Sequence, residues 1–159
     1  MDVLSYFRAE VEIIGRNWRE LLLGFDASSA VRRPAPNINH AVWLTGHMAW
    51  AEDYLILEVP RGQSARKREW DALFDFTSEK LPPEQYPPFD EVRTEFDRVH
   101  AEVLRVLQSM NPVDLGQPSV VERRWLPTAA HAISHQVGHG HYHLGQLAVL
   151  NRLREAGKL

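Results

Sequence analysis

The sequence of 159 residues predicts an all-α fold, a four-helix bundle. Apolar residues recur three and four positions apart in four separate stretches, which is the period of an amphipathic helix. No segment alternates between apolar and polar residues over a useful length, as a half-buried strand would. The link between the second and third stretches, residues 59–89, is long and rich in proline. Such a link can cross the bundle, so the second and third helices could run parallel.

The first helix is predicted from Asp2 to Leu23. Its apolar residues form one stripe that should face the core: Leu4, Phe7, Val11, Ile14, Trp18 and Leu21. Gly24 and the stretch DASSAVRRPAP, which is rich in turn residues and proline, end this helix.

The second helix is predicted from Asn37 to Glu58. Asn37 follows Pro36 and is a good N-cap residue, because its side chain can accept a hydrogen bond from a free backbone N–H of the first turn. Pro60 and Gly62 are expected to stop the helix.

Two further helices complete the predicted bundle. The third runs from Asp90 to Met110 and carries another apolar stripe with helical period. The fourth runs from Thr128, its expected N-cap, to about Glu155, and Gly157 lies just beyond its end. The stretch PSVVERRW, residues 118–125, could be a short extended piece, but no obvious partner strand exists.

Composition argues against several classes of function. The chain has no cysteine, so it offers neither a disulfide nor a thiolate of its own. A net charge of -3 without blocks of one sign argues against a nucleic-acid-binding surface. Charges run through the N-terminal stretch MDVLSYFRAEVEIIGRNWRE, and no apolar run is long enough for a membrane span. We therefore expect one domain over residues 1–159, no membrane segment and a cytoplasmic location.

Four of the eight histidines lie in the short segment HQVGHGHYHLGQL. Because a helix turns about 100° per residue, His139 and His143 lie roughly 40° apart on a face that also carries Leu147. This spacing lets two imidazoles bind one ion, although such pairs also occur by chance in histidine-rich helices. His141 points about 160° away and should face solvent or a partner chain.

Two histidines need a third ligand from another helix, and His47 is the best candidate. It lies in the middle of the second helix on a stripe with Trp43 and Tyr54, so it should face the interior. Leaving a buried polar group unpaired costs about 1–3 kcal/mol, so three inward histidines are best explained by a shared ion. Three nitrogen ligands leave positions open for water or substrate. They favour zinc or nickel, with iron, copper or manganese as alternatives.

The other histidines have more ordinary interpretations. We expect four of them to be surface residues or satisfied core residues: His40, His100, His131 and His141. His135 has the same interpretation, or it could hydrogen-bond one of the ligands.

Several neighbours of the histidines carry two interpretations. Gln146, one turn beyond His143, could hydrogen-bond a ligand imidazole or a water on the ion, or it could tie two helices together as a buried amide. Gly145 is expected to let the fourth helix approach a neighbour closely. Three aromatic residues could wall the mouth of the site or simply pack in the core: Trp43, Trp50 and Tyr54.

Charged residues near the predicted site are not expected to take part in chemistry. Glu52 and Asp53 lie well off the direction of His47, which argues against a role as general base. A basic cluster in the long link could meet an anionic cosubstrate such as a low-molecular-weight thiol, or it could be a solvated loop: Arg61, Arg66, Lys67 and Arg68.

Two stretches are similar to a known family. HGHYHLGQLAVLNRL resembles the C-terminal helix signature of the DinB/YfiT-like superfamily, in which H-x-x-x-H is followed directly by x-G-Q and an apolar run. NINHAVWLTGHMAWAED resembles the second helix of that family. The resemblance implies up-down-down-up helix order, frequent homodimers and a divalent metal held by His47, His139 and His143. Tyr142 stands where family members often have one more histidine.

The resemblance leaves the reaction open, because the family includes thiol-dependent S-transferases, a mycothiol-dependent maleylpyruvate isomerase and members with no assigned reaction. Our leading hypothesis is a metal-dependent thiol S-transferase or hydrolase of a small-molecule substrate. The ion would lower the pKa of an external thiol or of water. The alternatives are a non-catalytic metal-containing bundle, with a structural or sensing role, and a thiol-dependent isomerase. The sequence assigns no catalytic residue beyond the metal ligands.

Overall fold

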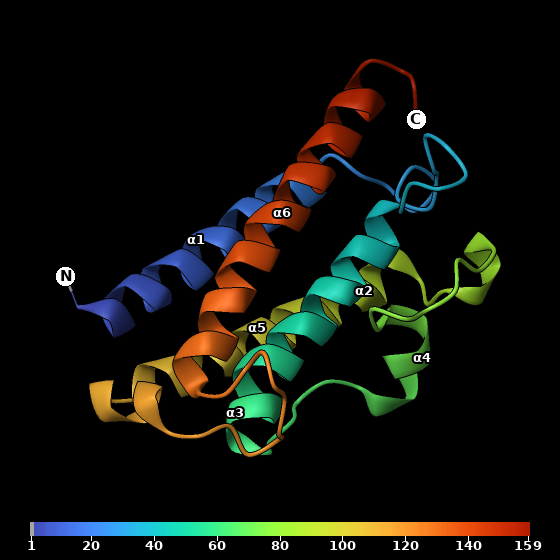
Figure 1. Cartoon of the computed structure of the whole chain (residues 1–159). Helices are drawn as coiled ribbons and strands as arrows, with labels where there is room; N and C mark the ends of the chain where they lie inside the picture. The colour runs from blue at the N-terminus through green and yellow to red at the C-terminus, as the bar shows by residue number, and fades with distance from the viewer. Residues whose placement is uncertain (1) are drawn as a thin grey trace.

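The structure, a computed structural model, describes residues 2–159 and is built from helices joined by loops (Figure 1). Within these residues there is no β-strand, only an isolated antiparallel bridge between Pro118 and Thr128. The all-α prediction is therefore confirmed, and the stretch 118–125 makes a bridge only at its first residue. Four long helices form the bundle: α1 (Val3–Leu22), α2 (Ala41–Glu52), α5 (Phe89–Ser109) and α6 (Ala129–Glu155).

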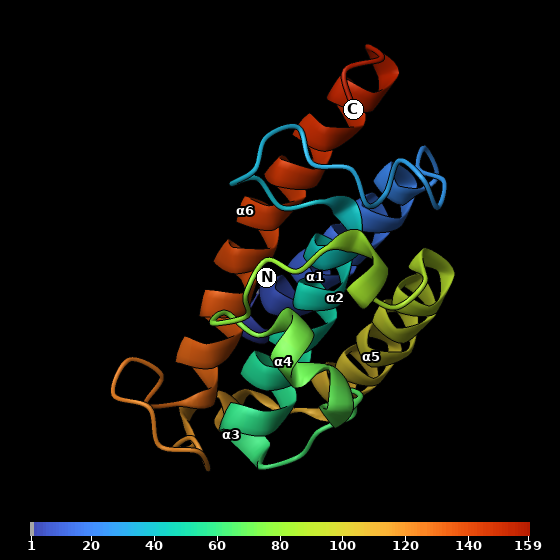
Figure 2. The same cartoon turned by 90° about the vertical axis from the view of Figure 1, so that its right-hand side faces the viewer.

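The helices α2 and α5 run in the same direction, and α1 and α6 run in the opposite one (Figure 1). This confirms the up-down-down-up order and the long crossover. Figure 2 shows the crossover passing in front of α2 on its way to α5. Short helical segments interrupt the crossover and the loop before α6: η2 (Arg68–Trp70), α4 (Asp71–Phe74), η3 (Pro83–Gln85) and η4 (Pro112–Gly116).

The first helix follows the prediction to within one residue at each end. Asp2 is its N-cap, because the carboxylate accepts a hydrogen bond of 3.0 Å from the backbone N–H of Ser5. The predicted stripe is buried as far as Trp18, but Leu22 rather than Leu21 closes it.

The second helix begins later than predicted. Its N-cap is His40, whose Nδ1 accepts a hydrogen bond of 3.0 Å from the backbone N–H of Trp43. Asn37 lies inside a turn closed by the N–H of Ile38 and the carbonyl of Ala35, three residues before the N-cap, so it does not cap the helix. The prediction of Asn37 was wrong because a buried imidazole nitrogen supplies the acceptor three residues further on.

Every residue of α2 is buried, so this helix is the centre of the bundle. A helix that is apolar on all sides is typical of such a position. After Glu52 the helix widens into a π-helical segment, η1 (Asp53–Glu58), and continues as α3 (Val59–Arg61). It ends at Gly62, whose φ of 66° is left-handed, and not at Glu58 as predicted.

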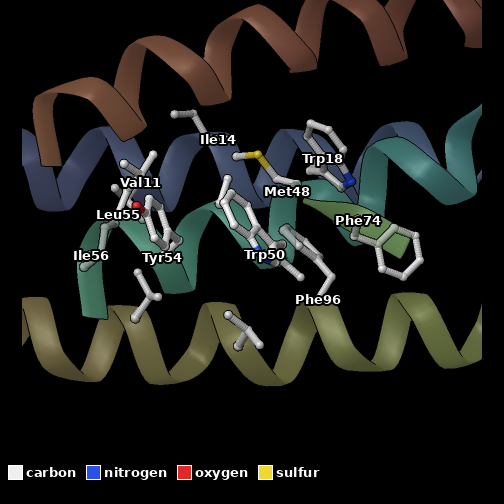
Figure 3. Packing of buried hydrophobic residues seen from close by; sticks show 14 of the residues in the cluster. Val11, Ile14, Trp18, Met48, Trp50, Tyr54, Leu55, Ile56, Phe74 and Phe96 are labelled. Carbon is white, nitrogen blue, oxygen red and sulfur yellow. The ribbon is translucent and has the colours of Figure 1, made fainter. Parts of the chain in front are cut away.

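The core lies between α1, α2, α5 and α6. Figure 3 shows large side chains from α1, α2 and α5 meeting there, among them Trp18, Met48 and Phe96. The close approach predicted for Gly145 is wrong, because no atom lies within 4 Å of a Cβ built there. Gly140 has this role instead, since a Cβ at that position would lie 2.9 Å from the Met48 side chain.

The third and fourth predicted helices correspond to α5 and α6. Thr128 occupies the N-cap position of α6 as predicted, and Gly157, with a φ of 65°, lies just past its end. None of the helices in residues 2–159 combines the length and the apolar content that crossing a membrane requires.

Candidate metal centre

The structure brings the three predicted histidines together from two helices. His47 lies in the middle of α2, and His139 and His143 lie one turn apart on α6. The Nε2 atom of His139 lies 3.2 Å from Nε2 of His47 and 3.0 Å from Nε2 of His143. One nitrogen from each ring lies within 4.8 Å of the others, so the group could hold a metal ion.

The outer nitrogens of two rings have fixed partners. Nδ1–H of His47 donates to the carbonyl oxygen of Phe74 over 2.7 Å, and Nδ1–H of His143 donates to Oε1 of Gln146 over 2.8 Å. A proton on Nδ1 of a neutral imidazole leaves a bare lone pair on Nε2. Both rings therefore present a lone pair toward His139. Histidines that bind metals are usually oriented in this way, by a hydrogen bond from the ring nitrogen that does not face the ion.

This set of donors fits a cation. The Nε2 atom of His139 could carry one proton at most, so it cannot donate to both neighbours, and at least one of the two close nitrogen pairs has no hydrogen bond. Nδ1 of His139 is buried without a hydrogen-bond partner. Tetrahedral zinc with zinc–nitrogen distances of 2.0–2.1 Å would separate its ligand nitrogens by about 3.3–3.4 Å, close to the spacings found here.

Burial keeps the three rings neutral. Desolvation, with a smaller contribution from the charge of His143, lowers the pKa of His47 to about 4, although the hydrogen bond to the Phe74 carbonyl opposes the shift. Desolvation, followed by repulsion from His143 and His47, lowers the pKa of His139 to about 3. Desolvation also lowers the pKa of His143. Near neutral pH all three nitrogens are therefore free to bind a positive ion.

Aromatic rings surround the histidines. The indole of Trp43 stacks on the His47 ring with centroids 4.5 Å apart, and its Nε1–H donates to Oγ of Ser78. A cavity of about 180 Å³ adjoins the cluster and is lined by Trp50, Tyr54 and the rings of two cluster histidines. Trp50 and Tyr54 thus wall the opening, whereas Trp43 packs behind His47.

The remaining histidines lie outside the cluster. His40 caps α2, and His100 is buried with Nδ1 2.9 Å from the carboxylate of Glu52. His131 and His141 are exposed, as predicted for residues without a role in the cluster. His135 has no hydrogen bond to a cluster histidine, but its ring centroid lies 6.1 Å from that of His139 and it lines the cavity.

The charged residues near α2 have structural partners. Glu52 is paired with His100, and Asp53 accepts hydrogen bonds from Ser64 and Arg66. Arg66 is buried and forms ion pairs with Asp53, Glu58 and Asp71, so it is neither solvated nor free for an anionic cosubstrate. That pairing was not predicted, because the three acids share no periodic spacing. Arg61 and Arg68 are exposed, and Lys67 is partly buried.

A partner that sequence reasoning missed is the carbonyl of Phe74, because a main-chain atom leaves no signal in a sequence. Gly46 makes room for it: a Cβ at this position would collide with the Phe74 ring. The Phe74 ring therefore packs directly against α2, and the Phe74 carbonyl lies within hydrogen-bond distance of His47.

A bundle of up-down-down-up order with three histidines converging from its second and last long helices defines a recognisable class of helical protein. The chain belongs to the DinB superfamily, whose profile matches residues 10–147. A crystal structure of a conserved protein from Enterococcus faecalis has the same fold, with a TM-score of 0.66 and 19% sequence identity over 96% of this chain and 97% of that chain. A comparison with curated proteins found no match.

Proposed function

We propose that the protein binds one divalent metal ion through His47, His139 and His143 and is a thiol S-transferase or hydrolase of a small molecule. The observation that carries the proposal is the convergence of three Nε2 atoms, with two of the rings fixed by hydrogen bonds at Nδ1. All-nitrogen ligands favour zinc or nickel, with iron, copper or manganese as alternatives.

Three protein ligands leave part of the coordination shell of an ion free. An ion held there would act as a Lewis acid and would lower the pKa of a thiol or water that binds it. His47 and His143 serve this chemistry by keeping their lone pairs aimed at one point. The chain has no cysteine, so any thiol has to come from a small molecule.

A non-catalytic bundle with a structural or sensing ion is the main alternative. Such a site needs no opening beside its ligands, since structural sites are closed. The cavity of about 180 Å³ that touches His47 and His139 supports catalysis instead. A thiol-dependent isomerase would use the same residues and would differ only in its product.

The decisive experiment is metal analysis of the purified protein, followed by assays with metal-loaded and metal-free protein. We expect one ion per chain. Low-molecular-weight thiols are then screened against chlorodinitrobenzene, and hydrolysis is tested with nitrophenyl acetate. Turnover should require the ion and should be lost in His139→Ala. Turnover that persists after confirmed removal of the metal contradicts the proposal, and a metal-loaded protein inactive in every assay supports the non-catalytic bundle.

We also propose a homodimer, a cytoplasmic location and no nucleic-acid partner. Sedimentation at several protein concentrations would test the dimer.

A further inference from the structure

The cavity beside the histidine cluster is walled almost entirely by rings. Trp50 and Tyr54 contribute from α2 and η1, Phe76 comes from the crossover, Trp125 comes from the loop before α6, and His135 comes from α6 itself. These elements lie far apart in the sequence, yet each places an aromatic or imidazole ring against the same space.

One wall is an ordered stack. His47 and Trp50 have ring planes only 9° apart and centroids 6.0 Å apart, and Trp50 and Tyr54 have planes 15° apart and centroids 4.8 Å apart. The rings share one face because their positions are three and four residues apart on a helix. The stack runs from the histidine cluster along the cavity, and its rings can pack edge-to-face or offset against another aromatic ring, which is flat.

Nothing in the lining neutralises a charge. The cavity contains no lysine, arginine, aspartate or glutamate among its lining residues. The Tyr54 hydroxyl already accepts a hydrogen bond of 2.7 Å from Nε of Arg123. In the metal-free protein, a charged ligand would lose its water without gaining an ionic partner, which is strongly unfavourable. The metal-free cavity therefore favours uncharged molecules.

Two of the rings are exposed to water. Phe76 is 74% exposed and Trp125 is 54% exposed, and both lie at this cavity. Phe76 already packs against Trp50, with ring centroids 5.9 Å apart, so a molecule in the cavity would lie beside this pair and would cover apolar surface of Phe76 and Trp125. The size also limits the ligand, because an apolar cavity of about 150 Å³ can hold benzene, and this one has about 180 Å³.

We propose that this cavity binds a flat, uncharged, apolar molecule of about one aromatic ring. The further statement that such molecules are the acceptor substrates of the histidine cluster rests on the function proposed above. Binding of the molecule does not depend on that function, since protein side chains form the walls of the cavity.

The test is an NMR titration of the tryptophan indole N–H signals with acetophenone, in zinc-loaded and in metal-free protein. Cyclohexyl methyl ketone is the matched ligand that is not flat, and benzoate is the matched ligand that is charged. We expect acetophenone to shift the Trp50 and Trp125 signals. It should bind about fivefold or more tightly than cyclohexyl methyl ketone in both forms of the protein, and than benzoate in the metal-free form, where no ion can hold the carboxylate.

Two variants locate the binding. Trp125→Ala and Phe76→Ala alter exposed side chains, so they should fold normally, and each should weaken acetophenone binding about fivefold. Tyr6→Ala, which removes an exposed aromatic ring on α1, should leave the dissociation constant unchanged. Circular dichroism checks the fold of each variant.

The outcomes separate the two proposals. Acetophenone binding without any zinc binding supports the cavity and contradicts the metal-dependent function. Zinc binding without acetophenone binding overturns the cavity proposal alone. Equal affinity for acetophenone and cyclohexyl methyl ketone also overturns it. So does an unchanged affinity for acetophenone in both Trp125→Ala and Phe76→Ala.

Discussion

His141 and His143 lie two positions apart on α6 and meet opposite surroundings. His143 is buried beside His139, whereas His141 is exposed and places Nε2 2.8 Å from the carboxylate of Glu10. We expect His143→Ala to remove most of the bound zinc and His141→Ala to leave it unchanged. Metal analysis after dialysis against the same zinc concentration measures both. Equal loss in the two variants would show that the ligand set is wrong.

Gln146 is expected to act through His143. Its Oε1 accepts the Nδ1–H of that ring, which keeps the Nε2 lone pair toward the cluster. Gln146→Ala should weaken zinc binding about 10–100-fold, as loss of such a partner typically does. Gln146→Glu keeps an acceptor and should bind zinc nearly as tightly as the wild type. Competition with a chelating dye measures the affinities, and an unchanged affinity in Gln146→Ala would remove this role.

At this scale the sequence predicts the inward residues better than their partners. The spacing of His139 and His143 follows from helix geometry alone, and the three histidines do converge. Of the two acceptors behind them, Gln146 was predicted as a possible partner of a ligand imidazole because it lies one turn beyond His143. The Phe74 carbonyl could not be predicted in this way, because its position depends on how the crossover folds. The basic cluster was misjudged for the same reason, since the burial of Arg66 depends on three acids from different segments.

Within α2, Gly46 lets the crossover pack directly on the helix. An alanine there would push the Phe74 ring away and disturb the carbonyl that holds His47. We expect Gly46→Ala to destabilise the fold by about 1–3 kcal/mol, as overpacking does, and to weaken zinc binding. Gly138→Ala on α6 has open space and should be neutral or stabilising by up to about 1 kcal/mol. Urea unfolding measures the free energy of unfolding of both variants. A similar change in Gly46→Ala and Gly138→Ala would contradict the packing argument.

The N-cap of α2 makes the helix sensitive to acid. Burial, and then the charge of Arg33, lowers the pKa of His40 to about 4. The unfolded chain, with a histidine pKa of about 6.5, binds a proton that the folded state excludes. Stability should therefore fall by about 1.4 kcal/mol per pH unit for this group as the pH drops from about 6 toward 4. His40→Asn keeps a cap acceptor but does not titrate.

Urea unfolding of metal-free protein at several pH values measures this effect. The free energy of unfolding should change less steeply with pH in His40→Asn than in the wild type. The difference in slope should be about 1.4 kcal/mol per pH unit, which corresponds to one proton. His131→Asn changes an exposed histidine and is the control. A slope in His40→Asn equal to that of the wild type would contradict the assignment.

The elements were predicted where periodicity is strong and missed where a single contact decides a boundary. The stripes of α1 and α5 face the core on one side, so their ends fall within one residue of the prediction. The helix α2 is buried on all sides, so no polar face marks its ends in the sequence, and its start depends on one hydrogen bond of His40. The helix was predicted as far as Glu58, but its widening into a π-helix over η1 and its extension to Arg61 were not, because this widening has no sequence period.

For the whole molecule, an ion would join the central helix to the last one. Zinc at a thousand times its dissociation constant should stabilise the folded state by about 4 kcal/mol. For a chain of this size that raises Tm by roughly 8–16 °C. Calorimetry with zinc and with a chelator measures the shift, and His139→Ala should show none. A zinc-induced shift of equal size in that variant would place the ion elsewhere.

The position of α6 in the chain has a consequence for how the protein is made. His47 is separated from His139 by 92 residues, and α1 and α2 both pack against α6. At about 5–20 residues per second, a ribosome releases α2 roughly 5–20 seconds before the other half of the cluster. During that interval a helix with no polar side is exposed without its cover. Any metal loading at this cluster therefore has to follow the synthesis of α6, and the growing chain is most open to aggregation and to chaperones just before α6 appears.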